Sequence, residues 1–195
     1  MPGDSIIPRP MAAITHAIKI KAPPERVWPW LAQMGAGRGG WYSYDFIDNG
    51  GNPSAISILL QYQKVACGDV FPAIPGATDA FIAAVVEQPW NLVLTVPKKD
   101  GGNLVSWDFL LKPLDQGYTR LIVRARISPH WLERTENDAS PDSLVLIERI
   151  YGVLAKIPRP LLLSVAGFGH RIMEARMLRG IKRRAEERII EVRLE

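Results

Sequence analysis

Cysteine is nearly absent from the chain, which has one, Cys67, in 195 residues. A single cysteine excludes an internal disulfide framework and any metal site built from several cysteines, and it fits a reducing compartment. Long hydrophobic runs are also missing, because the uncharged apolar run over 160–169 is about half of the ~20 residues that a membrane span needs. The first ten residues hold Asp4, Arg9 and three prolines instead of the apolar core of a signal peptide. We therefore expect a cytoplasmic protein with no transmembrane segment.

Excess charge is small and local. The chain has 24 basic and 20 acidic residues, a net charge of +4, and its C-terminal stretch 171–195 holds eight of the basic side chains against five acidic ones. In this stretch, arginines and Lys182 alternate with Glu174, Glu186 and Glu187, and no aromatic side chain accompanies them. Nucleic-acid sites usually combine a stronger basic field with stacking groups. We interpret the stretch as a solvated helix face and expect no nucleic-acid partner.

Hydrophobic periodicity predicts the secondary structure. Apolar residues alternate with polar ones over 14–20, which predicts a half-buried strand with His16 on its apolar face. Pro24 suits the first turn of a following helix, and Gly35 suits its end. Further strands joined by short turns imply an antiparallel meander; we place them at 80–87, 91–97, 104–112 and 118–128. On the last strand Arg120, Arg124 and Arg126 alternate with apolar residues, so we expect them to face solvent or to form ion pairs outside the sheet.

Helical patterns dominate the rest of the chain. Apolar residues recur at helical spacing from about 143 to 157 and again over 161–190, and Pro158 and Pro160 separate the two stretches. The order of strand, helices, several strands and a long final helix predicts an α+β fold in which that helix lies across one curved sheet. No linker divides the chain, so we expect a single domain over 1–195.

Several segments resemble the START-like SRPBCC superfamily, which includes polyketide cyclase-type and lipid-transfer domains, and one bacterial branch of it in particular. The similar segments follow one another along nearly the whole chain: Ala22–Gly35, Arg38–Asp45, Cys67–Asp69, Thr119–Leu121 and Met177–Lys182. The resemblance implies a helix-grip fold, in which a curved antiparallel sheet wraps around a long C-terminal helix and encloses an internal cavity. The chain departs from the family at about 129–160, where an extra helical segment replaces a short link.

The residues that could line such a cavity are aromatic, sulfur-containing or imidazole side chains. Apolar ligand sites are often lined by aromatic side chains and flexible methionines, although core packing explains each residue singly. We take as ligand-binding candidates His16, Trp41, Tyr44, Trp107, Phe109, Phe168, Met173 and Met177. His16 and Asp45 are also the candidate catalytic acid or base, with a satisfied core histidine and a solvated carboxylate as the simpler readings.

No cofactor or metal is expected. The spacing of His16, His130 and His170 does not match a metal-ligand motif. Gly35–Gly40 matches the pattern G-x-G-x-x-G, but a helix rather than a strand precedes it, which argues against a dinucleotide site.

We favour binding of a hydrophobic small molecule, such as a lipid, polyketide or aromatic compound. One alternative is a cyclase, dehydratase or hydrolase that uses the same cavity. Another is a module that docks on a membrane surface or forms a homodimer through the apolar region 144–170.

Overall fold

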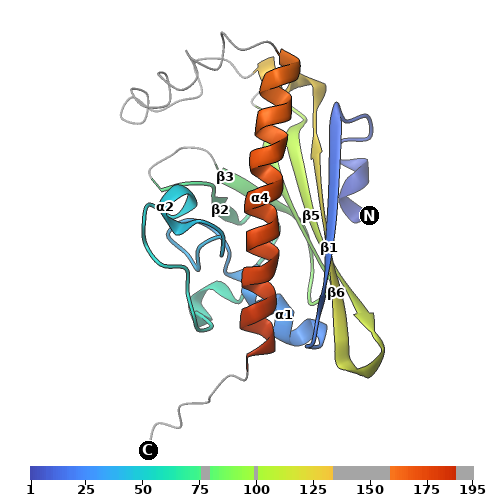
Figure 1. Cartoon of the computed structure of the whole chain (residues 1–195). Helices are drawn as coiled ribbons and strands as arrows, with labels where there is room; N and C mark the ends of the chain where they lie inside the picture. The colour runs from blue at the N-terminus through green and yellow to red at the C-terminus, as the bar shows by residue number, and fades with distance from the viewer. Residues whose placement is uncertain (76–79, 99–100, 134–158, 188–195) are drawn as a thin grey trace, which may run out of the picture.

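The structure is a computed structural model, and it describes residues 1–75, 80–98, 101–133 and 159–187 (Figure 1). Six antiparallel strands form one sheet in the order β1-β6-β5-β4-β3-β2. Strands β2 to β6 follow one another along the chain as a meander, and β1 pairs with β6, so that His16 lies opposite Val123. The strands are β1 (Ala12–Ile20), β2 (Val70–Pro72), β3 (Ala80–Glu87), β4 (Asn91–Pro97), β5 (Asn103–Leu114) and β6 (Tyr118–Ile127). The expected antiparallel meander is confirmed.

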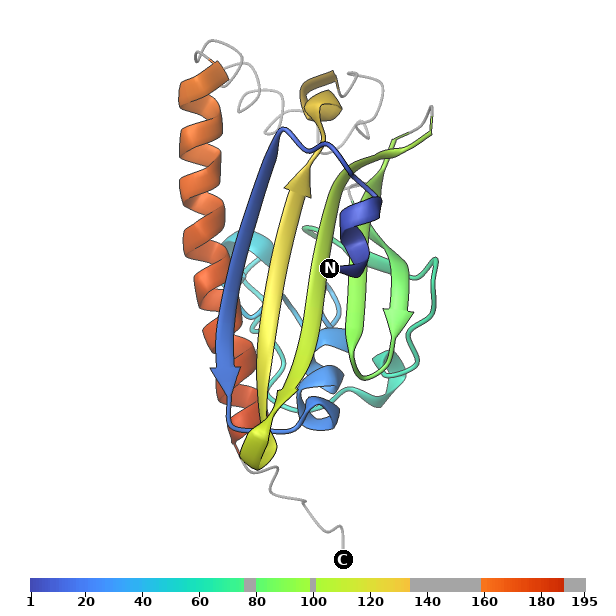
Figure 2. The ribbon, with the colours of Figure 1, turned by 90° about the vertical axis from the view of Figure 1, so that its right-hand side faces the viewer.

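Helices cover one face of this sheet. The long helix α4 (Arg159–Glu186) runs along β1, and α1 (Pro24–Ala32) packs between the lower part of α4 and strands β5 and β6 (Figures 1 and 2). The short α2 (Asp45–Asp48) and the chain around it lie beside α4, away from β1. Four 3-10 turns complete the described elements: η1 (Pro2–Ser5), η2 (Leu60–Tyr62), η3 (Asp115–Gly117) and η4 (Pro129–Glu133). Pro160 occupies the first turn of α4, where a missing N–H costs no hydrogen bond.

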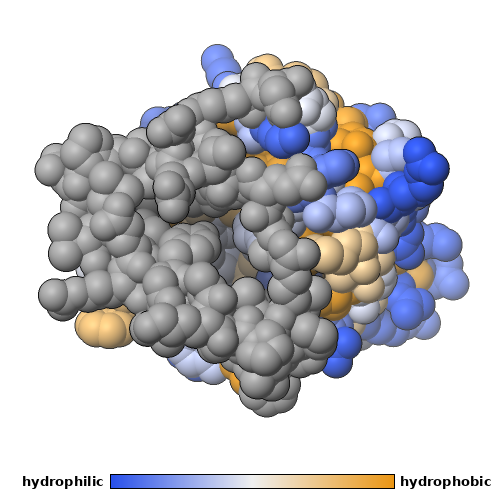
Figure 3. All heavy atoms as spheres, turned by 90° about the horizontal axis from the view of Figure 1, so that it is seen from above, coloured by the Kyte–Doolittle hydropathy of each residue, from blue (hydrophilic) through white to orange (hydrophobic). Residues whose placement is uncertain are grey.

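The core lies between the sheet and the two larger helices. Alternate residues of each strand face it, as the exposed and half-buried residues of β1 show by strict alternation. Its largest fully buried side chains come from both layers: Ile20, Trp28, Leu31, Met34, Phe71, Leu92, Leu94, Phe109, Leu111, Leu121, Met177 and Ile181. Hydrophobic residues also reach the surface at the upper end of the molecule, among hydrophilic ones (Figure 3).

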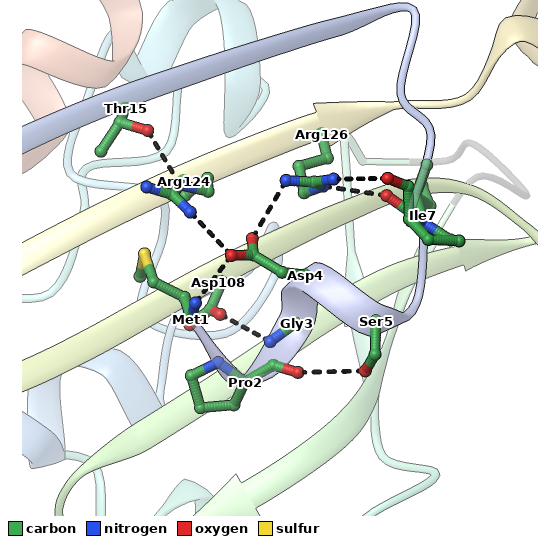
Figure 4. Close-up of polar contacts among 11 residues, drawn as sticks. Met1, Pro2, Gly3, Asp4, Ser5, Ile7, Thr15, Asp108, Arg124 and Arg126 are labelled. Carbon is green, nitrogen blue, oxygen red and sulfur yellow. Dashed lines mark hydrogen bonds and ion pairs between the residues drawn. The ribbon is translucent and has the colours of Figure 1, made fainter.

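The other face of the sheet is covered in part by the N-terminal turn η1. Asp4 accepts hydrogen bonds from the Met1 amine, at 2.7 Å, and from Arg124 of β6, also at 2.7 Å, while Arg126 lies 3.3 Å from its second oxygen (Figure 4). The Gly3 N–H donates to the carboxylate of Asp108 on β5 at 2.7 Å. Arg124 and Arg126 therefore form ion pairs outside the sheet and Arg120 is exposed, as their alternation predicts.

The fold class is confirmed as α+β, with a curved antiparallel sheet gripping a long C-terminal helix. Of the extra segment expected at about 129–160, the described part is the turn η4 and the start of α4; the helix predicted over 143–157 lies outside the described residues. In the described part of the chain, no helix is both long enough and apolar enough to cross a membrane.

Candidate functional site

Four side chains from three elements meet on the inner face of the sheet. His16 of β1 makes a short hydrogen bond through its Nδ1 to Oε2 of Glu174 on α4. The indole Nε1 of Trp107 on β5 donates to Oε1 of the same carboxylate at 3.3 Å. His170 lies one helical turn before Glu174, with its Nε2 3.7 Å from Oε2. We call these four residues the Glu174 cluster.

The carboxylate at the centre of the Glu174 cluster is fully buried. The Glu174 side chain is 0% exposed, whereas His16 is 32% and His170 35% exposed. Burial lowers the pKa of His170; the negative Glu174 counteracts this and the neighbouring His16 adds to it. The lowered pKa favours the neutral form of His170. The Nε2 of this imidazole is buried and has no hydrogen-bond partner in the described part of the chain.

The burial of the Glu174 carboxylate is not explained by a gain in stability. Taking an ionised group out of water costs several kcal/mol, and an apolar residue of similar size is often as stable or more stable in its place. Ionisable groups retained in a partly accessible, desolvated position mark candidate functional sites. The Glu174 cluster is a candidate on this ground, because two imidazoles that are about one-third exposed lie against a fully buried carboxylate.

Local periodicity brings the four residues together. His16 occupies an inward position in the alternation of β1, and Trp107 occupies an inward position in β5. His170 and Glu174 are four residues apart, which places them one above the other on the same face of a helix. Because α4 runs along β1, that face meets the strand at His16.

Aromatic rings surround the cluster. Trp107 stacks on Trp41 with ring centres 5.5 Å apart, and it contacts Phe81 at 5.4 Å and Phe109 at 4.9 Å. The His170 imidazole lies 6.0 Å from the Trp107 ring centre. Trp107 and Phe81 are only half-buried, so they combine packing with some access from solvent.

The other sequence candidates occupy three different environments. Phe109 and Met177 are buried in the core, and Met173 is half-buried on α4. Tyr44 lies beneath the guanidinium of Arg176, which belongs to a different surface of α4. Phe168 is part of α4, but its side chain lies outside the described structure.

Asp45, the second catalytic candidate, is not part of the Glu174 cluster. Its Oδ1 accepts a hydrogen bond from the Ser54 hydroxyl at 2.5 Å, and it lines a pocket on the side of α4 away from the sheet. His16 and Asp45 therefore belong to separate surfaces and do not form an acid–base pair.

Glu174 is the residue that sequence reasoning missed. We grouped it with the solvated glutamates of the basic stretch, and this interpretation is wrong because the sheet buries its side chain completely. Its spacing of four from His170, next to apolar Met173 and Met177, was the available signal. Phe81 and His170 were also left out of the candidate set.

The described residues hold no group of three or more histidine, cysteine, aspartate or glutamate side chains placed to bind a metal ion. Pockets of about 530 Å³ and 220 Å³ open beside α4 on its outer side, rather than between α4 and the sheet. An internal cavity stays a prediction.

Comparisons with known proteins return structural similarity alone. No protein-family model and no curated protein matches the chain. Among solved structures, it is similar to the Polyketide_cyc-like protein Cgl2372 from Corynebacterium glutamicum, with 18% identity, 91% of this chain and 92% of that one covered, and a TM-score of 0.44. It is also similar to Ms6760 from Mycobacterium smegmatis, with 12% identity, 88% of each chain covered and a TM-score of 0.43.

A third similar structure is PFC0360w, an HSP90 activator from Plasmodium falciparum, with 11% identity, 69% of this chain and 94% of that one covered, and a TM-score of 0.38. Independently of these values, the strand order and the terminal helix are those of a helix-grip protein.

Proposed function

We propose that the protein binds a small hydrophobic molecule with one hydrogen-bonding group, such as a lipid, polyketide or aromatic compound, between the sheet and α4. The observation that carries the proposal is the buried Glu174 carboxylate, held by His16 and Trp107 on the inner face of the grip. The resemblance to cavity-forming SRPBCC domains supports the same location.

The two parts of the ligand would meet different groups. Its apolar part would lie against Trp107 and Phe81, since burying apolar area contributes about 25 cal/mol per Å² without any charged contact. Its hydroxyl or carbonyl group would bind to the imidazoles of His16 and His170, which can donate or accept a proton and are about one-third exposed. Such a site is mostly apolar with a few polar groups that orient the ligand.

Two probes of matched shape test this division. N-phenyl-1-naphthylamine, a neutral dye that fluoresces in apolar sites, is displaced by naphthalene or by 2-naphthol, which differ by one hydroxyl. We expect both to displace the dye, with 2-naphthol favoured by up to about tenfold, the upper end of the net contribution of one hydrogen bond, about 0.5–1.5 kcal/mol. Glu174→Gln should remove most of this preference, while Glu187→Gln, which removes an exposed carboxylate, should keep it. A dye that does not bind, or an unchanged preference in Glu174→Gln, contradicts the proposal.

The hydrogen bond between His16 and Glu174 favours a second function, acid–base catalysis. A carboxylate that holds one imidazole nitrogen sets the orientation of the other nitrogen for proton transfer. The corresponding assay is deuterium incorporation from D₂O into the central carbon of an aryl 1,3-diketone, followed by NMR. Exchange faster than in buffer that disappears in His16→Ala would support this function, and equal rates for both proteins would exclude it for this substrate class.

A further inference from the structure

A second surface, on the side of α4 away from the sheet, carries positive charge that the fold does not neutralise. Arg171, Arg176 and Arg179 are exposed there, and Arg184 is 8% exposed. None of the four has a carboxylate of a described residue within 4.0 Å, whereas the neighbouring Lys182 and Arg183 pair with glutamates one turn further along α4. We call Arg171, Arg176, Arg179 and Arg184 the arginine face.

The arginine face lines a hollow. The pocket of about 530 Å³ beside α4 has five cationic side chains in its lining, Arg176, Arg179, Lys182, Arg183 and Arg184, against two acidic ones, Asp45 and Glu186. A second pocket of about 220 Å³ shares two of these residues and adds Arg171. Positive side chains concentrated around a concave surface raise the local potential and favour anionic groups there.

Two of these arginines are held in place by neutral partners. Arg176 donates from Nε to the Ser43 carbonyl at 2.8 Å and lies over the Tyr44 ring at 4.5 Å. Arg184 donates from Nε to the Ala55 carbonyl at 2.7 Å. These contacts fix the charges without cancelling them, and they attach the chain around residues 43–44 and 55 to α4.

The same two attached segments lead into the two most exposed large hydrophobic side chains of the described structure, Phe46 and Ile56. Phe46 is 89% exposed and Ile47 60%, two and three residues after Tyr44, while Ile56 is 87% exposed and follows Ala55 directly. Figure 1 shows α2 and the chain that follows it on one side of α4. These side chains follow directly on the residues that hold Arg176 and Arg184, so exposed apolar groups flank the arginine face. Apolar surface next to polar side chains is typical of interaction surfaces.

We propose that this surface docks the protein on an anionic membrane, with the arginine face over lipid headgroups and Phe46, Ile47 and Ile56 inserted at the interface. A soluble anion would satisfy the arginines but would leave the apolar side chains in water. An anionic bilayer satisfies both, because peripheral binding grows with buried apolar area and with attraction between cations and acidic lipids. The occupant is thus a bilayer rich in acidic lipid, and the attachment is peripheral.

Sedimentation with vesicles tests the proposal on the full chain. Vesicles of phosphatidylcholine with about 30% phosphatidylserine should bind the protein near 0.05 M salt and release most of it near 0.5 M, because salt screens the attraction. Vesicles of phosphatidylcholine alone should bind it much more weakly. Arg171→Gln/Arg179→Gln should lower the partition coefficient about 25-fold, or about fivefold for each charge near the surface.

Matched variants separate the contributions of charge and apolar contact. Lys112→Gln/Arg120→Gln removes two exposed cations that face each other across β5 and β6 on the outer side of the sheet, and should change binding less than twofold. Phe46→Ser/Ile47→Ser should weaken binding while keeping its dependence on salt. Circular dichroism establishes that each variant is folded.

Three results would overturn the proposal. One is equal binding to the two kinds of vesicle, and another is wild-type binding by Arg171→Gln/Arg179→Gln. The third is absence of vesicle binding together with stabilisation by inorganic phosphate or by an acidic polypeptide that depends on the same arginines, since the surface would then serve a soluble anion or a protein.

Discussion

Substitution of the two glycines of α4 by alanine should have opposite effects on stability. Gly180 packs against Tyr42, and a Cβ added there would lie 2.4 Å from the Tyr42 carbonyl oxygen and 2.7 Å from the Tyr42 Cβ. A Cβ added at Gly169 would have no described neighbour within 4 Å. Both positions lie inside the helix, so they share the gain in helix propensity and differ in the contact with Tyr42.

Tyr42 cannot move easily out of the way. Its backbone has a positive φ of 58°, and its side chain is buried. Its hydroxyl donates to the Trp30 carbonyl at 3.0 Å, and its N–H donates to Ser54 Oγ at 3.1 Å. Since ordinary carbon contacts lie at about 3.5–4.0 Å, α4 itself would have to shift by about 1 Å to accept the new methyl group.

The expected magnitudes follow from these contacts. Overpacking costs about 1–3 kcal/mol, and replacing a helical glycine by alanine gains about 1 kcal/mol. Because the added Cβ of Gly180→Ala meets backbone that cannot move aside, the upper part of the overpacking range applies, about 2–3 kcal/mol. Gly180→Ala should therefore lower the free energy of unfolding by about 1–2 kcal/mol, and Gly169→Ala should raise it by about 1 kcal/mol. With a urea dependence of about 2 kcal/mol per molar, the midpoints should move down by about 0.5–1 M and up by about 0.5 M.

Urea unfolding followed by circular dichroism measures both midpoints in parallel. A Gly180→Ala protein as stable as the wild type would refute the close packing of α4 on Tyr42. It would also undermine the placement of the arginine face, because Arg184 stacks over the same Tyr42 ring.

Further predictions concern ionisable groups. Burial raises the pKa of Asp4, but the Met1 amine, Arg124 and Arg126 outweigh it and lower the pKa overall. The stabilising contribution of Asp4 is thus present above the unfolded value of about 3.9 and is lost as the pH falls through the folded value. Between pH 5 and pH 2, the urea midpoint of Asp4→Asn should therefore fall less than the midpoint of the wild type. Burial lowers the pKa of His170, so the contribution of His170 to stability is present above about pH 6.5 and decreases as the pH falls. His170→Gln should therefore reduce the loss of stability between pH 7.5 and 5. An unchanged pH profile would show that His170 titrates as in the unfolded chain. Arg184→Lys should lower the free energy of unfolding by about 1–3 kcal/mol, because an ammonium group cannot keep the hydrogen bonds to Ala55 and Gly180 while stacking on Tyr42. The control is Arg183→Lys at an exposed position, which should change the free energy of unfolding by less than about 0.5 kcal/mol.

The fold could be predicted to a large extent because its signals are local. Alternation over 14–20 and over the four later strands, with short turns between them, implies antiparallel pairing whatever the rest of the chain does. The predicted helix boundaries lie within a few residues of those of α1 and α4, because Pro24 and Pro160 occupy the first turns of these helices. The side of the sheet on which the arginines of β6 lie followed from the same alternation.

The candidate site was predictable only in part. His16 and Trp107 were identified because an imidazole on an apolar face and a strand rich in aromatics are unusual within a local window. Asp45 and Tyr44 were grouped with them only by their chemistry, and the structure places both on the other side of α4. Periodicity assigns residues to faces of one element, but it does not say which faces of two elements meet.

The sequence by itself determined an α+β protein with one antiparallel sheet, a long terminal helix and an inward-facing His16, because these depend on residue spacing within single elements. Only the tertiary structure decided the role of Glu174 and of the arginines around it. Along α4 they form one run of charges. The packing of the helix against β1 buries the carboxylate of Glu174 and leaves Arg176 and Arg179 outside, because a helix has two sides and contact with the sheet selects one of them.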